Sequence, residues 1–311
     1  MHTNQFIARA FILSLCLVFS GAVAAQTQDE ESSRQIVLDR FNKARPAEDV
    51  TAGIGGSRPN NAAVKPPIYR RTGQIRRPGG RKPAPVPSEE LGVTVWRLRP
   101  SQSSDTGARV LVLDGLKQAE WTPERIEADT PLNIGDRVRL TVESPRAGFL
   151  YIIDRELYAD GSLGEPLMIF PTTRTRGGDN RVAPGKLIDI PAQEDQYTYF
   201  TAQPGSARRD QVAEVLTLIL VSQPLPLQIG DQPLKITDTQ VAGWEKLWGG
   251  TAERLELVGG AGRAWTNEEK AAGAAKGRQL TPAGPPPQTV YRLARRAGGP
   301  LLVTVPLRYA R

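Results

Sequence analysis

The chain has 311 residues, with 40 Lys and Arg against 33 Asp and Glu, and a formal net charge of +7 at pH 7. Its single His is His2 and its single Cys is Cys16, and both lie in an N-terminal segment that we expect to be removed. Without them the chain has no Ser-His-Asp triad, Cys-His pair, disulfide, Cys/His zinc site or axial haem ligand. The sequence also contains no phosphate-binding loop and no HExxH, GxSxG or EF-hand motif. We therefore expect a protein that is not an enzyme and that binds neither a metal nor a cofactor.

Residues 1–25 have the pattern of a secretory signal peptide. Arg9 lies in a short polar start, residues 11–19 form an apolar core, and Ala22-Val23-Ala24 supplies the small residues that a signal peptidase recognises. The apolar core is shorter than the roughly 20 residues that a membrane-spanning helix needs, which disfavours a membrane anchor. We expect a mature chain without a transmembrane segment that is exported to the periplasm, and secretion from the cell is the alternative.

Residues 26–90 are rich in Pro, Gly, Ala, Arg and Asn and contain few large apolar residues. Such a segment cannot bury enough surface to offset the entropy that it loses on ordering, so we predict a disordered tether. Ser32 and Gln35 form a capping box that predicts one short helix over residues 32–44. That helix either lies in a solvated tail, which its short length favours, or docks on a partner or on its own domain.

The predicted tether is basic, with 12 Lys and Arg against 8 Asp and Glu, a surplus of +4. Arg70, Arg71, Arg76 and Arg77 lie among prolines in a stretch without any Asp or Glu. An extended basic segment suits weak contact with lipid headgroups, acidic polysaccharide or an acidic patch on a partner protein. A soluble spacer is the alternative, and nucleic acid is not expected because the chain is predicted to be exported.

Residues 91–311 carry the patterns of β-strands. Residues 137–143 alternate apolar and polar side chains, residues 149–154 are apolar on both faces, and residues 166–171 follow an Asp160-Gly161 turn. We predict that these three strands form an antiparallel meander. Further strands are predicted at residues 93–98, 109–114, 187–191, 197–202 and 213–222. Together they predict a mainly β fold, an antiparallel β-sandwich-like domain over residues 91–311.

Arg174, Arg176 and Arg181 flank the glycine-rich stretch from Gly177 to Asn180. A polar loop of this composition is a common place for partner contacts, so these arginines join those of the tether as candidate partner or anion contacts. Trp121 lies in a polar stretch, and we expect it to pack against a sheet edge.

The C-terminal third predicts a helical insertion over residues 237–280 and a hairpin over residues 289–309. Capping boxes begin two helices, one at Thr237 and one at Thr266. Trp244 and Trp248 lie four residues apart on the first helix, either as a sugar-stacking platform or, as we expect, as the face that packs on the sheet. Pro306 in the last strand predicts an edge strand or the outer strand of the hairpin.

The order of these segments resembles a known family. GDRVRLTVES, GFLYIID, a DG turn, an apolar strand ending in FP, RVAPGKLIDIP and a late strand ending in S-x-P-L follow one another. This order is similar to the bacterial family catalogued as domain of unknown function 4384, over about residues 93–227. The resemblance implies a β-sandwich-like module, with a family-like core at residues 91–227, in exported or multidomain bacterial proteins. It implies no catalytic residues.

These patterns favour a non-catalytic, exported envelope protein that binds a protein or glycan partner, with the tether giving it reach. One alternative is association with an anionic membrane or polymer through the Arg-rich tail. A second alternative is a hydrolase that uses carboxylates, with Asp154, Glu156, Asp160 and Glu165 as candidates. The hydrolase would require two of these carboxylates to face each other inside a cleft with shifted pKa values.

Overall fold

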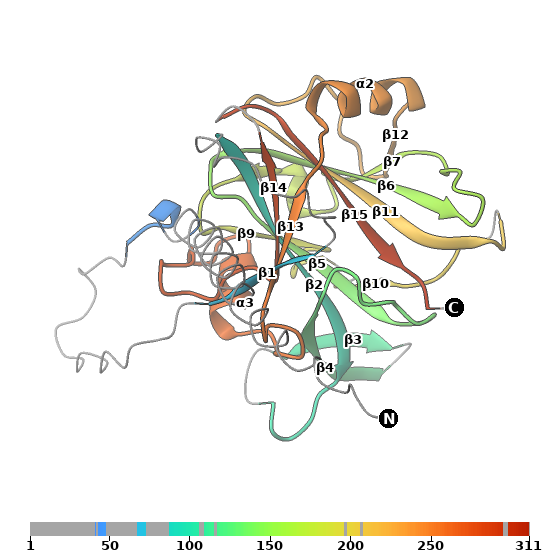
Figure 1. Cartoon of the computed structure of the whole chain (residues 1–311). Helices are drawn as coiled ribbons and strands as arrows, with labels where there is room; N and C mark the ends of the chain where they lie inside the picture. The colour runs from blue at the N-terminus through green and yellow to red at the C-terminus, as the bar shows by residue number, and fades with distance from the viewer. Residues whose placement is uncertain are drawn as a thin grey trace, which may run out of the picture.

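The computed structural model describes residues 41, 43–47, 67–72, 87–105, 109–114, 117–195, 198–205, 208–294 and 298–310. This part of the chain is mostly β, with two antiparallel sheets and few, short helices (Figure 1). The prediction of a mainly β, sandwich-like fold is therefore confirmed. The predicted leader, residues 1–25, lies outside the described residues.

Sheet one is built around the long strand β2. Its strands are β1 (Tyr69–Thr72), β2 (Ser88–Pro100), β3 (Val110–Asp114), β4 (Lys117–Ile126), β5 (Arg137–Glu143), β9 (Leu187–Ile190), β10 (Phe200–Thr201), β13 (Glu253–Leu257) and β14 (Thr289–Ala294). They run in the order β1-β13-β14-β2-β4-β3. Strand β5 pairs with the opposite edge of β2, and β9 and β10 pair with β5.

Sheet two is centred on the long strands β6 and β11. Its strands are β6 (Gly148–Tyr158), β7 (Leu167–Phe170), β8 (Arg181–Val182), β11 (Gln211–Val221), β12 (Leu234–Lys235) and β15 (Leu301–Arg308). They run in the order β12-β7-β6-β11-β15, and β8 pairs with the start of β6. Strand β15 pairs only with β11 in this order, so Pro306 lies in an edge strand, as predicted.

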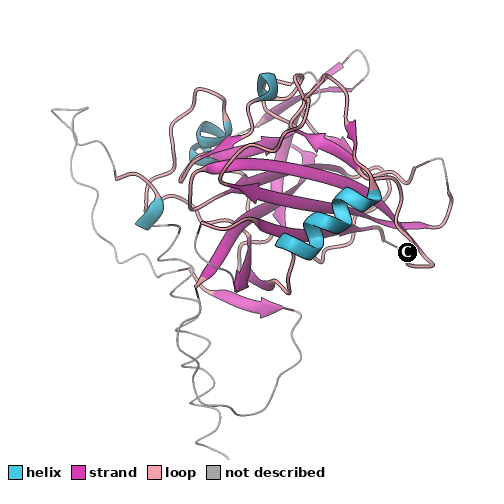
Figure 2. Ribbon diagram, turned by 90° about the horizontal axis from the view of Figure 1, so that it is seen from above, coloured by secondary structure: helices cyan, strands magenta, loops and turns pink. Residues whose placement is uncertain are grey.

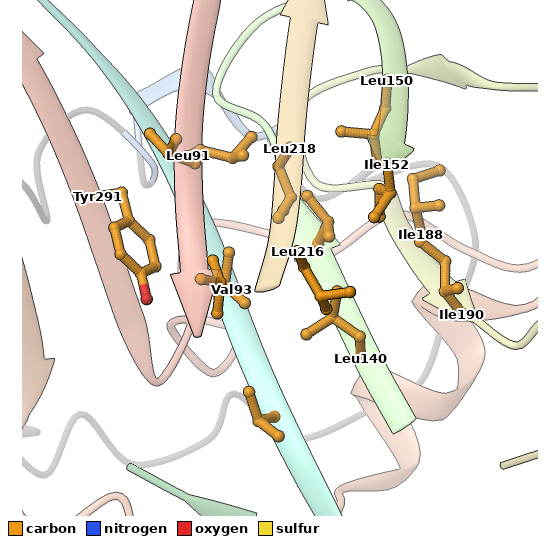
Figure 3. Close-up of a cluster of buried hydrophobic side chains, with 14 of the residues drawn as sticks. Leu91, Val93, Leu140, Leu150, Ile152, Ile188, Ile190, Leu216, Leu218 and Tyr291 are labelled. Carbon is orange, nitrogen blue, oxygen red and sulfur yellow. The ribbon is translucent and has the colours of Figure 1, made fainter. Parts of the chain in front are cut away.

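The main core fills the space between the two sheets. Every second residue of a strand points to the same face, so the apolar positions of the alternating strands meet there. Leu140 from sheet one and Ile152, Leu216 and Leu218 from sheet two belong to one buried cluster, and Figure 3 shows how these side chains lie between the strands. Each such side chain contributes roughly 1.5–3 kcal/mol by its removal from water.

The outer face of sheet two is covered by α2 (Asp238–Trp248), which lies across the strands (Figure 2). The Thr237 side chain accepts a hydrogen bond from the backbone of Gln240, as the capping pattern predicts. Trp244 and Trp248 pack against a second buried cluster that includes Ile153 and Ile219. The expectation that the two tryptophans form the packing face of the helix is confirmed.

The outer face of sheet one carries buried polar groups beneath α3 (Asn267–Gly273), which contacts β9. The predicted capping box of Thr266 and Glu269 is present. Glu269 also pairs with the buried Arg125, and Arg139 pairs with Asp189 at 3.3 Å. This second layer of helix and loop keeps β5 and β9 buried on both faces.

Two predicted strand pairings are wrong. β5 lies in sheet one and β6 in sheet two, so the chain crosses between the sheets after β5, and only β6 and β7 form the predicted antiparallel pair. Likewise β14 pairs with β2 and β13, while β15 pairs with β11, so no hairpin joins the last two strands. In both cases each strand buries one face in the same core, and an alternating pattern looks the same for either sheet.

Parts of the predicted tether are ordered. Residues 69–72 form β1 on β13, and β2 begins at Ser88 instead of near residue 91. Phe41, at the end of the predicted helix 32–44, is buried beside Tyr69. Of the two alternatives for that helix, docking on its own domain holds for this end, because Phe41 packs in a buried apolar cluster with Leu255 and Val290. Residues 32–40 lie outside the described residues. The polar stretch that contains Trp121 also forms a strand, β4, and Trp121 packs against the cluster around Trp96.

No helix within the described ranges is long and apolar enough to cross a membrane.

Candidate functional site

A cavity of about 180 Å³ opens between the two sheets, at the end of the sandwich where β5, β10 and the end of β15 meet. Its walls are mostly apolar and come from both sheets, with Leu140, Ile152, Ile190 and Leu216 among them. Figure 3 shows these four side chains among the core residues. Phe200, which is 43% exposed, and the exposed Thr201 form part of the mouth.

Two carboxyl groups from sheet two line the same cavity. Asp154 on β6 follows Leu150 and Ile152 on the inner face of the strand, and Glu214 on β11 precedes Leu216 there. Because Asp154 lies opposite Leu216 in the register, Asp154 and Glu214 are diagonal neighbours. The strand alternation that buries the leucines therefore also places both carboxyls between the sheets.

Hydrogen bonds hold Glu214 but leave one oxygen of Asp154 without a partner. The Tyr309 hydroxyl donates to Glu214 Oε1 at 3.0 Å, and Gln211 Nε2 donates to the same oxygen at 2.7 Å. Asp154 shares a hydrogen bond with Glu214, yet Asp154 Oδ1 is buried and finds no hydrogen-bond partner within the described part of the chain. Burial of an acceptor oxygen without a hydrogen bond costs free energy, so Oδ1 can accept a hydrogen bond from a ligand.

Burial and the neighbouring negative charge raise the pKa of Asp154 to about 8. Burial also raises the pKa of Glu214, although the donors Gln211 and Tyr309 oppose this effect. The raised pKa of Asp154 therefore favours a proton on this pair of carboxyls near neutral pH. Among the residues that the structure describes, no Lys or Arg forms an ion pair with either carboxyl.

Of the four carboxylates that the sequence suggested for a hydrolase, Asp154 is the one that lines the cavity. Glu156 lies opposite Glu214 in the register and accepts a hydrogen bond from the Tyr158 hydroxyl. Asp160 binds Ser162 and Arg208, which lowers its pKa to about 2, and Glu165 pairs with Lys235 at the surface. They are not brought together as a set of four.

Glu214 was not among the residues singled out from the sequence. The available signal was a single carboxylate inside the otherwise apolar strand pattern of residues 213–222. A charged residue is rarely found on the inner face of a buried strand, because burial of its charge is costly unless it is paired. That rule would have pointed to Glu214 if the inner face of the strand had been known.

The arginines suggested as anion or partner contacts do not gather at one place. Arg70 and Arg71 lie in β1, where they pair with Glu127 and Glu253. Arg76 and Arg77 lie outside the described residues.

The three loop arginines follow β7. Arg174 pairs with Asp231 at 3.2 Å and Arg181 with Asp179 at 2.8 Å, both at exposed positions. Arg176 has a positive φ of 53° and donates to the Leu187 carbonyl. These contacts lie within the protein and give no common site for an anion.

No group of three or more His, Cys, Asp or Glu side chains suited to a metal ion occurs in the described ranges. The candidate site is therefore the cavity with its carboxyl pair, and its chemistry is that of a mostly apolar pocket with two neighbouring carboxyl groups.

No family model, curated protein or solved structure matches the chain. The resemblance to the family of unknown function stays a prediction.

Proposed function

We propose that this chain is a non-catalytic binding module of the bacterial envelope, exported to the periplasm, that holds a protein partner through the cavity between its two sheets. The observation that carries the proposal is the cavity itself, which combines apolar walls with Asp154, whose Oδ1 has no hydrogen-bond partner in the described part of the chain. Mostly apolar pockets with a few converging polar groups are the common form of a binding site.

The cavity favours a protein partner over a glycan. Sugars present many hydroxyl groups, which lose hydrogen bonds against apolar walls such as Leu140 and Ile190. In another protein a cavity of about 150 Å³ holds benzene, so a space of this kind accepts one side chain. The two tryptophans of α2 do not supply a free sugar platform, because both pack against the sheet.

Association with an anionic surface through the Arg-rich tail is the weaker alternative. Arg70 and Arg71 already have carboxylate partners in the protein, which cancels much of their attraction for an external anion.

A carboxylate hydrolase is the second candidate function, because Asp154 keeps a proton near neutral pH beside Glu214. The pair is joined by a hydrogen bond, whereas glycosidases separate their two carboxyls by about 5 Å or more to admit the scissile bond. This contact favours binding. Turnover of a glycoside, ester or amide that is lost in both Asp154→Asn and Glu214→Gln would favour the hydrolase instead.

The test of the binding module uses a photo-crosslinking amino acid at Phe200, at the mouth of the cavity, in intact cells. We expect a discrete adduct with one envelope protein, and no such adduct when the crosslinker replaces the exposed Leu247 on α2. Thr201→Trp fills the mouth and should abolish the adduct, while Thr239→Trp on the exposed face of α2 should not. Adducts of equal yield at both positions, or an adduct insensitive to Thr201→Trp, would refute the proposal.

A further inference from the structure

We propose that the cavity takes an aliphatic cation of the size of an Arg or Lys side chain, with its charged head at Asp154 and Glu214 and its stem against the apolar walls. This inference rests on the proposed function, since it names the chemistry of the ligand for the same cavity. The site differs from a surface cluster of acids because it lies in a mostly apolar cavity between the sheets and because Asp154 Oδ1 is buried without a hydrogen-bond donor among the described residues.

The positions of the acceptors favour a head with several N–H groups. Glu214 Oε1 already accepts from Tyr309 and Gln211, so its place is fixed before any ligand arrives. Asp154 also lines the cavity, and its buried Oδ1 has no hydrogen-bond partner within the described ranges. A guanidinium or ammonium group can donate to both carboxyls at once, and its charge strengthens each hydrogen bond.

The charged groups around the cavity also favour a cationic ligand. Among the described residues, the ionisable side chains that interact with Asp154 are Glu214 on β11, Glu156 on β6 and Tyr309 after β15. None of them is a cation. Arg139 on β5 also lines the cavity, but its guanidinium pairs with Asp189 and lies over the Trp265 ring, away from the carboxyl pair.

The size and walls of the cavity limit the rest of the ligand. Leu140, Ile152 and Leu216 suit a methylene stem, which long cationic side chains commonly lay against apolar surface. The mouth at Phe200 and Thr201 is exposed, so a side chain can enter from a partner protein. An anion is disfavoured because it would lie beside two carboxyl groups.

Binding of a cation should release a proton. In the empty site Asp154 keeps its proton because burial and Glu214 raise its pKa to about 8. A bound cation favours the ionised form of both carboxyls and takes the place of that proton. The affinity should therefore fall as the pH is lowered below about 8, by up to about tenfold per pH unit.

The test is calorimetric titration of the full-length mature chain with propylguanidinium, which stays charged at every pH used, and with the neutral analogue propylurea. We expect binding of propylguanidinium with release of about one proton, weaker binding at lower pH, and no binding of propylurea. Arginine blocked at both backbone ends, titrated in parallel, distinguishes a free cation from a side chain: entry of the blocked residue supports a partner protein as the source.

Asp154→Asn is the decisive variant, because Asn can still donate to Glu214 as the protonated acid does but cannot give up a proton. It should weaken propylguanidinium binding at least tenfold and remove the proton release, whereas Glu165→Gln at the exposed ion pair with Lys235 should change neither. Equal binding of propylurea and propylguanidinium, or unchanged affinity in Asp154→Asn, would overturn the cation. If Thr201→Trp still abolished the Phe200 adduct, the binding module would remain supported and only the proposed cationic ligand would be wrong. If the adduct and the selective binding of propylguanidinium were both absent, both proposals would be wrong.

Discussion

The ion pair of Arg45 and Glu143 ties a residue before the sheets to the edge of the core. Both side chains are buried, with exposed fractions of 0% and 3%, and Arg45 Nε and Nη2 each donate to Glu143 at 2.8 Å. Arg45 Nη1 also donates to the Gly284 carbonyl at 2.9 Å. This residue therefore joins β5 to the loop before β14, two segments far apart in the sequence.

We predict that Arg45→Ala lowers the free energy of unfolding by about 3–5 kcal/mol, because Glu143 would remain buried without a counter-charge. Arg174→Ala removes an exposed pair with Asp231 and should cost less than about 1 kcal/mol. Urea denaturation of both variants measures the difference. Equal losses of unfolding free energy in the two variants would show that the buried pair stabilises the fold no more than the exposed pair does.

The raised pKa of Asp154 predicts how the free energy of unfolding changes with pH. Its pKa is about 8 in the folded protein and about 3.9 in an unfolded chain, so the folded state binds the proton more tightly between these values. Stability from this group is fully present below about pH 4 and is lost as the pH rises through about 8. We expect the wild type to lose on the order of 4 kcal/mol more than Asp154→Asn between about pH 5 and pH 9, measured by thermal unfolding, because about three pH units of this window lie below the folded pKa at about 1.4 kcal/mol each. Parallel pH profiles for the two proteins would contradict this assignment.

At the scale of elements, α2 shows how an amphipathic helix is fixed by one face. Trp244 is half-buried against the cluster of sheet two, while Leu247 on the same helix is 65% exposed. We predict that Trp244→Ala costs about 2 kcal/mol and that Leu247→Ala stays within about 0.5 kcal/mol. Chemical denaturation of the two variants tests this, and a larger effect at Leu247 would reverse our assignment of the packing face.

The strands could be predicted from the sequence, but their partners could not. Period-two alternation located β5 and β15 to within a few residues, and an apolar run with β-branched residues located β11. These patterns gave no information about which sheet a strand joins, because strands on both sides of a sandwich bury one face in the same core. The predictions of the meander and of the C-terminal hairpin were wrong for this reason.

The candidate site was predicted even less completely. Asp154 was singled out together with three carboxylates close to it in the sequence, but Glu214 and Tyr309 reach the cavity from β11 and from the end of β15. Their meeting depends on the β6–β11 and β11–β15 pairings, which are long-range contacts. The spacing of residues along the sequence does not predict such contacts. The tether prediction erred at Phe41 and Tyr69 because composition averages over a segment and overlooks single anchoring side chains.

At the scale of the whole molecule, the last strands complete both sheets. β14 pairs with β2 in sheet one, and β15 pairs with β11 in sheet two. A chain that ends at Leu227 lacks both strands and exposes the inner faces of their neighbours to water. We predict that it does not fold, as measured by circular dichroism and urea unfolding, and that limited proteolysis of the full chain releases no stable fragment ending there. A stable fragment ending near Leu227 would show instead that the core of residues 91–227 is independent.

In our proposal a ligand enters between the two sheets beside Asp154. Methyl-labelled protein titrated with propylguanidinium and followed by NMR tests it most directly, because Leu and Ile methyl groups line the cavity and also fill the separate cluster under α2. We predict saturable shifts at Leu140, Ile152, Ile190 and Leu216, with none at Ile219 and Ile236. Shifts confined to the cluster under α2, or no saturable shift at the cavity, would contradict binding at this site.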